Sequence, residues 1–316
     1  MSPDPKRPRM TDPARRARTG FALGLSAYFV WGVLPLYFKA LTAVAPTEIV
    51  AHRIIWSILF LAPLVLLGGR LSGIAAAIRA PRLAMLLALT AGLIGVNWLV
   101  YIYAVVNGHV LEASLGYYLN PLVNVMLGVL VLKERLSPIQ KGAVALAALA
   151  VAFLALRSGG AVWISLALGF SFALYGFLRK VAPVEPLDGL AVETIFLAPI
   201  ALGWILWLQH AGQSGFLQNR QTDALLIFGG ALTALPLLLF TAAAKRLPYS
   251  TLGFLQYLTP SLQFLLAVLA FGEPLTGAHI LCFAAIWTSL LLFVAEGVRL
   301  GRRARDTGLA ARAVPS

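Results

Sequence analysis

The sequence predicts an all-α membrane protein of ten transmembrane helices, arranged as two inverted five-helix repeats. The first observation behind this is composition. Of 316 residues, 60% are hydrophobic and only 12% are charged, which is too apolar for a chain that exposes its surface to water. The second observation is a series of apolar runs of membrane-spanning length, and the third is that one of these runs occurs twice.

The chain contains ten apolar runs, each close to the length of about 20 residues that a spanning helix needs. Transmembrane β-strands would be about half as long and would alternate in polarity, so the runs predict helices. In chain order they cover residues 20–41, 47–68, 83–106, 110–132, 138–156, 161–178, 189–209, 223–244, 249–272 and 277–298.

Lys and Arg residues are concentrated in the tails and in every second loop between these runs. With the N-terminus in the cytoplasm, 21 of the 25 Lys and Arg residues fall in cytoplasmic tails and loops. The outer side keeps only Lys39, Arg157 and Arg220, and Arg53 lies within a run. Positively charged loops mark the cytoplasmic side of a membrane protein, so the pattern predicts ten spans with both termini inside.

The fourth run superimposes on the ninth when the sequence is shifted along itself. The shift that aligns Tyr118 with Tyr257 also aligns Pro121 with Pro260 and, after the run, Glu134 with Glu273. Ten spans in two copies give five per copy, and an odd number places the second copy upside down relative to the first. Inverted repeats of this kind are characteristic of secondary transporters, which bind solute near the midplane.

A polar stripe lies along the fourth run and is duplicated in the ninth. It comprises Tyr117, Asn120 and Asn124, and the shift gives Gln256, Thr259 and Gln263 the equivalent helix face. Pro121 and Pro260 lie near the middle of these runs, where proline bends a helix and frees a carbonyl. We interpret both stripes as walls of a substrate cavity. The alternative is that the amides only mediate helix packing.

Three further charged or titratable residues lie inside runs. Arg53 is suited to hold a substrate carboxylate or phosphate, and the alternative is that it anchors its helix at the interface. Glu193 and His52 are the proton-coupling candidates, although Glu193 could equally form a hydrogen bond between helices. Because Arg53 and Glu193 lie near opposite membrane surfaces, we expect two separate charges and no salt bridge between them.

Other polar residues have more modest expected roles. Asn97 and Tyr101 of the third run are expected to line the same cavity. Glu112 is expected to be solvated near the N-terminus of its helix, where negative charge is favourable. Glu134 and Glu273 follow helices, where negative charge is unfavourable, so we expect turn-forming roles with local compensation.

Motifs for catalysis, metal binding and nucleotide binding are missing from the sequence. The prediction is therefore that the chain is not an enzyme and has no metal or cofactor. Nucleic-acid binding is not expected either, because the cations lie in tails and short loops. The single cysteine, Cys282, rules out an intramolecular disulfide.

Five stretches resemble RarD-type permeases of the EamA group, within the drug/metabolite transporter superfamily. They are residues 28–39 (YFVWGVLPLYFK), 48–57 (EIVAHRIIWS), 97–103 (NWLVYIY), 107–124 (NGHVLEASLGYYLNPLVN) and 250–264 (STLGFLQYLTPSLQF). The resemblance covers nearly all of residues 20–298. It implies two inverted five-helix repeats, a bacterial inner-membrane location and the transport of small metabolites or drugs, with efflux as the default direction.

The predicted organisation is a disordered basic tail (1–18), two repeats (19–158 and 159–298) and a second basic tail (299–316). The predicted function is secondary transport of a small solute by alternating access. The expected partners are that solute and membrane lipids, with a homodimer left open. A membrane-embedded lipid-modifying enzyme and a non-transporting receptor are the alternatives.

Overall fold

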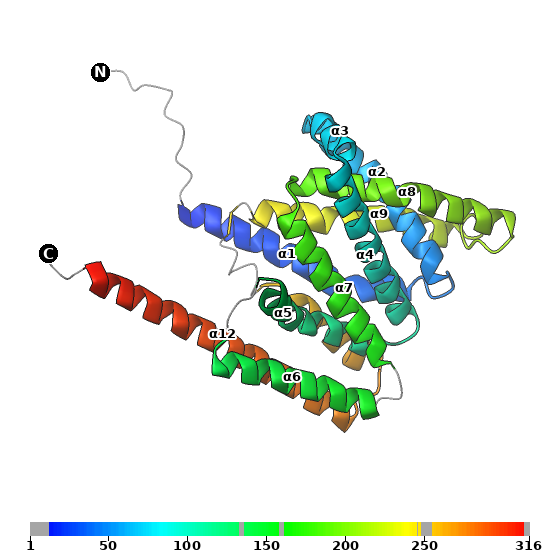
Figure 1. Ribbon diagram of the computed structural model, residues 1–316. Coiled ribbons are helices and arrows are strands. Elements are labelled where there is room, and N and C mark those ends of the chain that lie inside the picture. The colour runs from blue at the N-terminus through cyan, green and yellow to red at the C-terminus, as the bar shows by residue number, and fades with distance from the viewer. Residues whose placement is uncertain (1–12, 133–135, 158–160, 245, 248–254, 313–316) are drawn as a thin grey trace, which may run out of the picture. The chain divides into compact units, whose positions relative to one another are not determined.

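The computed structural model describes residues 13–132, 136–157, 161–244, 246–247 and 255–312, and all regular structure within these residues is helical (Figure 1). The elements are α1 (Pro13–Lys39), α2 (Pro46–Leu67), α3 (Leu71–Arg79), α4 (Pro81–Val106), α5 (Val110–Leu132), α6 (Pro138–Arg157), α7 (Val162–Val181), α8 (Pro186–His210), α9 (Arg220–Ala244), α11 (Leu258–Leu265), the π-helical turn η1 (Leu266–Ala270) and α12 (Gly277–Arg312).

Proline begins five of these helices, at Pro13, Pro46, Pro81, Pro138 and Pro186. The first position of a helix suits proline, because its N–H would have no partner inside the helix anyway and its fixed φ is already helical. The boundaries predicted from the apolar runs therefore lie close to those observed.

Eight helices of the described chain are long and apolar enough to cross a membrane, namely α1, α2, α4, α6, α7, α8, α9 and α12. Their outward-facing apolar side chains include Leu67, which is 90% exposed, and Leu156, which is 86% exposed. Such side chains require lipid around them. The chain is therefore a multi-pass membrane protein.

The two remaining predicted spans, residues 110–132 and 249–272, are not among these eight helices. Residues 110–132 form α5, of 23 residues, whereas the run 249–272 lies partly outside the described residues. Its described part forms α11 and η1, after a turn at Gln256 and Tyr257. Pro121 lies inside α5. Pro260 lies in the first helical turn of α11, just after the non-helical residues Gln256 and Tyr257.

Both tails contain helix beyond the predicted spans. Residues 13–18, which we predicted to be disordered, form the first turns of α1, so the prediction was wrong for them. Alanine and arginine are good helix formers and here extend the spanning helix into the tail. At the other end, α12 continues to Arg312, well past the predicted end of the span at residue 298.

The chain divides into two compact units, and each combines segments from both halves of the sequence. Unit 1 contains residues 1–91 and 183–266, and unit 2 contains residues 92–182 and 267–316.

In unit 1, α2 and α8 pack in opposite directions (Figure 1). The acid in the first turn of each helix contacts the segment that follows the other. Glu48 of α2 binds Ser214, which lies after α8, and Asp188 of α8 lies 3.8 Å from Arg70, which lies after α2. These reciprocal contacts fix the two helices as antiparallel. An apolar cluster joins α2, α3, α4 and α8 through Val65, Ile74, Ala77, Leu87, Ala191 and Val192.

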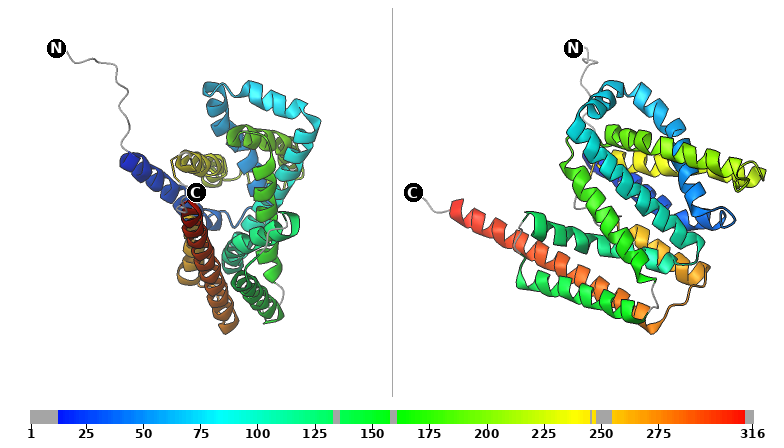
Figure 2. Two further views of the ribbon diagram at one scale, coloured as in Figure 1. Left: turned by 60° about the vertical axis from the view of Figure 1, so that its left-hand side comes forward. Right: turned by 45° about the vertical axis from the view of Figure 1, so that its right-hand side comes forward.

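In unit 2, the start of α5 lies beside the start of α12. Glu112 of α5 faces His279 of α12, and further along both helices the ring of Tyr118 contacts those of Phe283 and Trp287. The two helices are therefore parallel. On its other side α5 packs against α7, and α12 packs along α6, as Figure 2 also shows.

Candidate functional site

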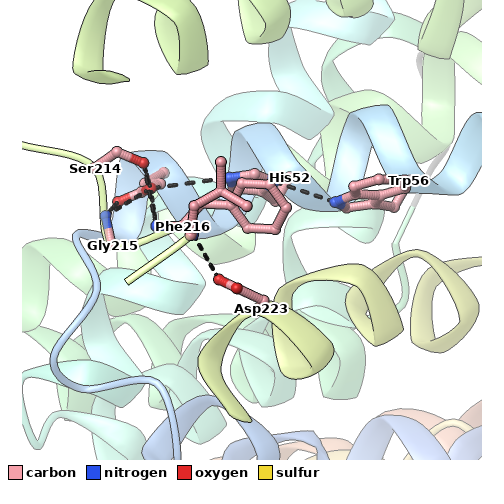
Figure 3. Close-up of polar contacts among 8 residues, drawn as sticks. His52, Trp56, Ser214, Gly215, Phe216 and Asp223 are labelled. Carbon is pink, nitrogen blue, oxygen red and sulfur yellow. Dashed lines mark hydrogen bonds and ion pairs between the residues drawn. The ribbon is translucent and has the colours of Figure 1, made fainter. Parts of the chain in front are cut away.

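A polar centre of unit 1 lies at the start of α2, around the carboxylate of Glu48, whose partners Ser214, Gly215 and Phe216 are labelled in Figure 3. Glu48 is only 1% exposed. Its Oε1 accepts hydrogen bonds from Ser214 Oγ at 2.7 Å and from the backbone N–H groups of Gly215 and Phe216 at 2.9 and 3.2 Å. A buried carboxylate is stable when donors surround it in this way. Glu48 therefore fixes the loop after α8 against α2.

The loop held by Glu48 places an aromatic side chain on His52. The rings of Phe216 and His52 have centroids 4.6 Å apart, and the ring of Trp56 contacts the same Phe216 ring, with centroids 6.3 Å apart. Trp56 Nε1 donates a hydrogen bond to His52 Nδ1 at 3.1 Å. Because an indole N–H can only donate, Nδ1 must be unprotonated in this arrangement. A neutral His52 then carries its proton on Nε2, which lies 3.8 Å from Glu48 Oε1.

Arg53 follows His52 in α2 and is also buried. A side chain that anchored its helix at the lipid interface would be exposed. Its Nε donates a hydrogen bond to Thr233 Oγ1 of α9 at 3.1 Å, and its guanidinium lies over the ring of Phe38 of α1, 5.4 Å from the centroid. Gly229 of α9 allows this approach, since a Cβ there would lie 3.1 Å from the Arg53 side chain. Three helices thus enclose the cation in protein.

Glu193 of α8 has a different partner. Its Oε1 lies 2.6 Å from the hydroxyl of Thr90 of α4, and both side chains are buried. The sequence left two roles open for Glu193, a hydrogen bond between helices and proton coupling. The structure shows the hydrogen bond. Arg53 and Glu193 therefore have separate contacts, to Thr233 and to Thr90.

The predicted stripe at 256–263 belongs to unit 1 and contacts α1. Thr259 Oγ1 donates to the carbonyl of Tyr28 at 2.9 Å, and Gln263 Nε2 donates to the carbonyl of Trp31 at 3.3 Å. Gln256 lies in the turn before α11 and is partly exposed. The donors of Thr259 and Gln263 are therefore used in packing α11 against α1. Helix packing is the role that the sequence offered as the alternative to a cavity wall.

The other predicted stripe belongs to unit 2, where the structure brings three of the predicted residues together. Tyr117 OH donates to Asn97 Oδ1 at 3.4 Å, and the rings of Tyr117 and Tyr101 make an edge contact at 5.7 Å. Asn97 Nδ2 in turn donates to Ser171 Oγ of α7 at 2.9 Å. The third and fourth predicted spans therefore share one polar and aromatic cluster.

Asn120 lies on α5 one turn after Tyr117 and is 8% exposed. Its Oδ1 is buried and has no hydrogen-bond partner within the described residues. An unsatisfied buried carbonyl is costly unless a water or a ligand completes it. The side chain of Asn124 lies outside what the structure describes.

Two acids of unit 2 differ from expectation. Glu112 was expected to be solvated, but it is 8% exposed, because His109 and His279 lie on either side of its carboxylate. Glu273 accepts hydrogen bonds from the N–H groups of Val110 and Leu111 at 2.9 and 2.8 Å. The compensation expected for Glu273 thus comes from the N-terminus of α5, a helix distant in sequence. Glu134 lies outside the described residues.

Sequence reasoning missed the contacts of Glu48 and Asp188. One signal could have found them, because Glu48 follows Pro46 at the same spacing at which Asp188 follows Pro186. Within the described residues, no group of three or more His, Cys, Asp or Glu side chains is arranged to hold a metal ion.

A family model for EamA-like transporters matches residues 18–156 and, a second time, residues 159–295. The chain belongs to the EamA-like transporter family. The relatives show that it is a RarD-type member, which confirms the resemblance found in the sequence. Protein RarD of Escherichia coli K12 is 44% identical over 291 residues, covering 92% of this chain and 98% of the relative.

Other members of this family match over similar lengths. An uncharacterized transporter of Vibrio cholerae serotype O1 is 46% identical over 297 residues, covering 94% of this chain and 98% of the relative. The chloramphenicol-sensitive protein RarD of Pseudomonas aeruginosa is 33% identical over 294 residues, covering 92% and 98%. A crystal structure of a protein with 20% identity superposes with a TM-score of 0.58, covering 87% of this chain and 97% of that chain, which shows a shared fold alone.

Proposed function

We propose that this EamA-family protein is a secondary active transporter that moves a small metabolite or drug-like solute across the inner membrane by alternating access, in the direction of efflux. The observation that carries the proposal is that the polar, proline-containing fourth run is duplicated as the ninth. A pair of inverted repeats gives two similar states of nearly equal energy, open to opposite sides, which is what alternating access needs. The family and the names of the relatives support the same function.

Helix directions within unit 1 support counting α5 as a span. Each crossing of the membrane reverses the direction of the chain. Antiparallel α2 and α8 therefore need an even number of crossings between them. Only α4, α6 and α7 lie between them among the eight candidate spans, so α5 is needed as the fourth.

The same argument within unit 2 supports a span in the run 249–272. Parallel α5 and α12 need an odd number of crossings between them. The helices α6, α7, α8 and α9 supply four, so one more is needed before α12 begins at Gly277. The total is then ten. With the cations on alternate loops, both termini are cytoplasmic.

Each unit has its own proposed solute contacts, and their amide, hydroxyl and aromatic groups suit a small polar or amphipathic solute. In unit 2 they are Tyr117, Asn120, Asn124, Asn97 and Tyr101, and in unit 1 they are Gln256, Thr259, Gln263 and the cation Arg53. Asn120 is the strongest of them, because its buried Oδ1 has no hydrogen-bond partner among the described residues. Glu193 and His52 remain the proposed proton-coupling residues, and Pro121 and Pro260 the proposed bends.

A ligand screen on the purified full-length protein tests this proposal. A solute that binds the folded state raises the apparent melting temperature. We expect a hit among amino acids, organic acids and amphipathic antibiotics that include chloramphenicol. Asn120→Ala should abolish the shift, whereas Asn107→Ala, the same change at an exposed asparagine, should retain it. A shift of equal size in both variants would remove Asn120 from the site.

A further inference from the structure

The start of α12 carries a capping arrangement that recurs at the start of α6. In α6, Ser137 N–H donates to Gln140 Oε1 at 3.0 Å and Gln140 N–H donates to Ser137 Oγ at 3.3 Å. This reciprocal pair is a capping box. The shift that superimposes the fourth run on the ninth also aligns these residues with Thr276 and His279, which make the same pair of contacts, both at 3.4 Å.

Glutamine is therefore sufficient for the cap, and histidine makes it with longer contacts. What histidine adds is a second ring nitrogen that can carry a proton. This nitrogen, Nε2, lies 3.8 Å from Glu112 Oε1, is buried and has no hydrogen-bond partner within the described residues. The side chain of His279 is 9% exposed and that of Glu112 is 10% exposed.

We propose that Glu112 and His279 form a proton-binding site that is separate from Glu193 and His52. In the neutral imidazole, Thr276 N–H donates to Nδ1, so the ring proton is on Nε2 and faces Glu112. A proton from the aqueous phase adds to Nδ1 and breaks the long contact, 3.4 Å, in which Thr276 N–H donates to this atom. The hydroxyl of Thr276, 2.8 Å from Nδ1, then accepts a hydrogen bond from it. A hydroxyl suits both states, because it can donate or accept.

The surroundings give the site a counter-charge and a route to water. His109 Nδ1 lies 3.7 Å from Glu112 Oε2, and its side chain is 36% exposed, so it connects the buried pair with the solvent-facing side. The second acid at this end, Glu273, is occupied by the N–H groups of α5. From α6, which packs along α12, the guanidinium of Arg157 is held over the ring of Phe153 at 6.0 Å. Ser165 Oγ of α7 donates a hydrogen bond to the backbone carbonyl of Glu112 and not to its carboxylate, which faces the two histidines.

The test is a titration of the full-length protein, labelled with ¹⁵N-histidine and held in lipid nanodiscs, by solid-state NMR from about pH 5 to pH 9. His279→Gln assigns the signal and keeps the cap, since Gln140 makes it in α6. We expect a charged-imidazole signal from His279 that becomes neutral as the pH rises. Glu112→Gln should move the midpoint of this change to lower pH, because the carboxylate stabilises the charged ring. Glu185→Gln, at an exposed carboxylate, should leave it unchanged.

A His279 signal that stays neutral throughout, or a midpoint equal in wild type and Glu112→Gln, would overturn the site. Should Glu112→Gln fail to fold, Thr276→Val provides the second variant. It removes the acceptor for the protonated Nδ1 and should lower the midpoint, whereas Thr276→Ser should restore it, and equal midpoints in both would also overturn the site. A role of this proton in driving solute movement rests on the proposed transport function. A titrating pair in a protein that moves no solute would keep the site and remove only that role.

Discussion

Trp56 donates its indole N–H to Nδ1 of His52 across 3.1 Å, and this one hydrogen bond selects the tautomer of a buried imidazole. The selected tautomer directs the remaining ring N–H toward Glu48, which also holds the loop carrying Phe216. Protonation of Nδ1 would place two donors against each other, so His52 could take up a proton only if Trp56 moved.

Replacing Trp56 with Phe tests this relationship. The change keeps an aromatic ring but removes the donor, so we expect a loss of about 1 kcal/mol in the free energy of unfolding and loss of the tautomer preference. Thermal unfolding and ¹⁵N shifts of His52 measure the two effects. Trp204→Phe, which changes a lipid-exposed tryptophan stacked on Trp207, is the matched control. Equal effects of both changes would contradict the assignment.

The loop clamp at Glu48 gives a second prediction. Glu48→Gln keeps the shape of the side chain but replaces a charged acceptor by an amide, whose NH₂ group competes with donors for the same space. Hydrogen bonds to charged groups contribute about 1.5–3 kcal/mol, so we expect destabilisation of this order. Chymotrypsin cleavage at Phe216 should also become faster. Glu185→Gln, at the exposed start of α8, should change neither.

The contact between α2 and α9 depends on Gly230. A Cβ at this position would lie 2.5 Å from the backbone carbon of Trp56, so the two helices would have to separate. We expect Gly230→Ala to destabilise the protein by about 1–3 kcal/mol. In contrast, a Cβ on Gly203 of α8 meets nothing within 4 Å, and Gly203→Ala should stabilise the helix by about 0.5–1 kcal/mol. Similar melting temperatures for the two variants would contradict the described packing.

Topology is tested with single cysteines. Cys282 is buried, so a Cys282→Ser background is expected to fold and to remove background labelling. Gln213→Cys lies after α8 and Ser72→Cys lies in α3, after α2, and both positions are exposed. The proposed ten-span topology puts them on opposite sides. A membrane-impermeant maleimide should label Gln213→Cys in cells whose inner membrane is intact, and Ser72→Cys only after lysis. Labelling of both in intact cells would contradict the topology.

The helices could be predicted from the sequence because lipid imposes a simple requirement. A span needs about 20 apolar residues with all backbone groups bonded internally, and that pattern is local. The cluster of Asn97, Tyr101 and Tyr117 was also predicted in part, because helical spacing places each residue on a polar face.

The pairings across helices could not be predicted in this way. Glu273 caps α5 from a distant part of the sequence, and Glu112 meets His279 of another helix. Nothing in a single helical face specifies which neighbour it packs against. Glu112 therefore resembled an ordinary acid in a first helical turn, and Thr259 and Gln263 resembled cavity residues although their donors are bonded to α1.

Solute counterflow is the most direct measurement of the central claim. Liposomes that contain the purified full-length protein are preloaded with an unlabelled solute, and uptake of the same labelled solute is followed without ATP, for amino acids, organic acids and chloramphenicol. A secondary transporter predicts transient accumulation above protein-free liposomes for at least one solute, lost in Asn120→Ala and kept in Asn107→Ala. Uptake equal to protein-free liposomes across the whole panel would contradict the claim.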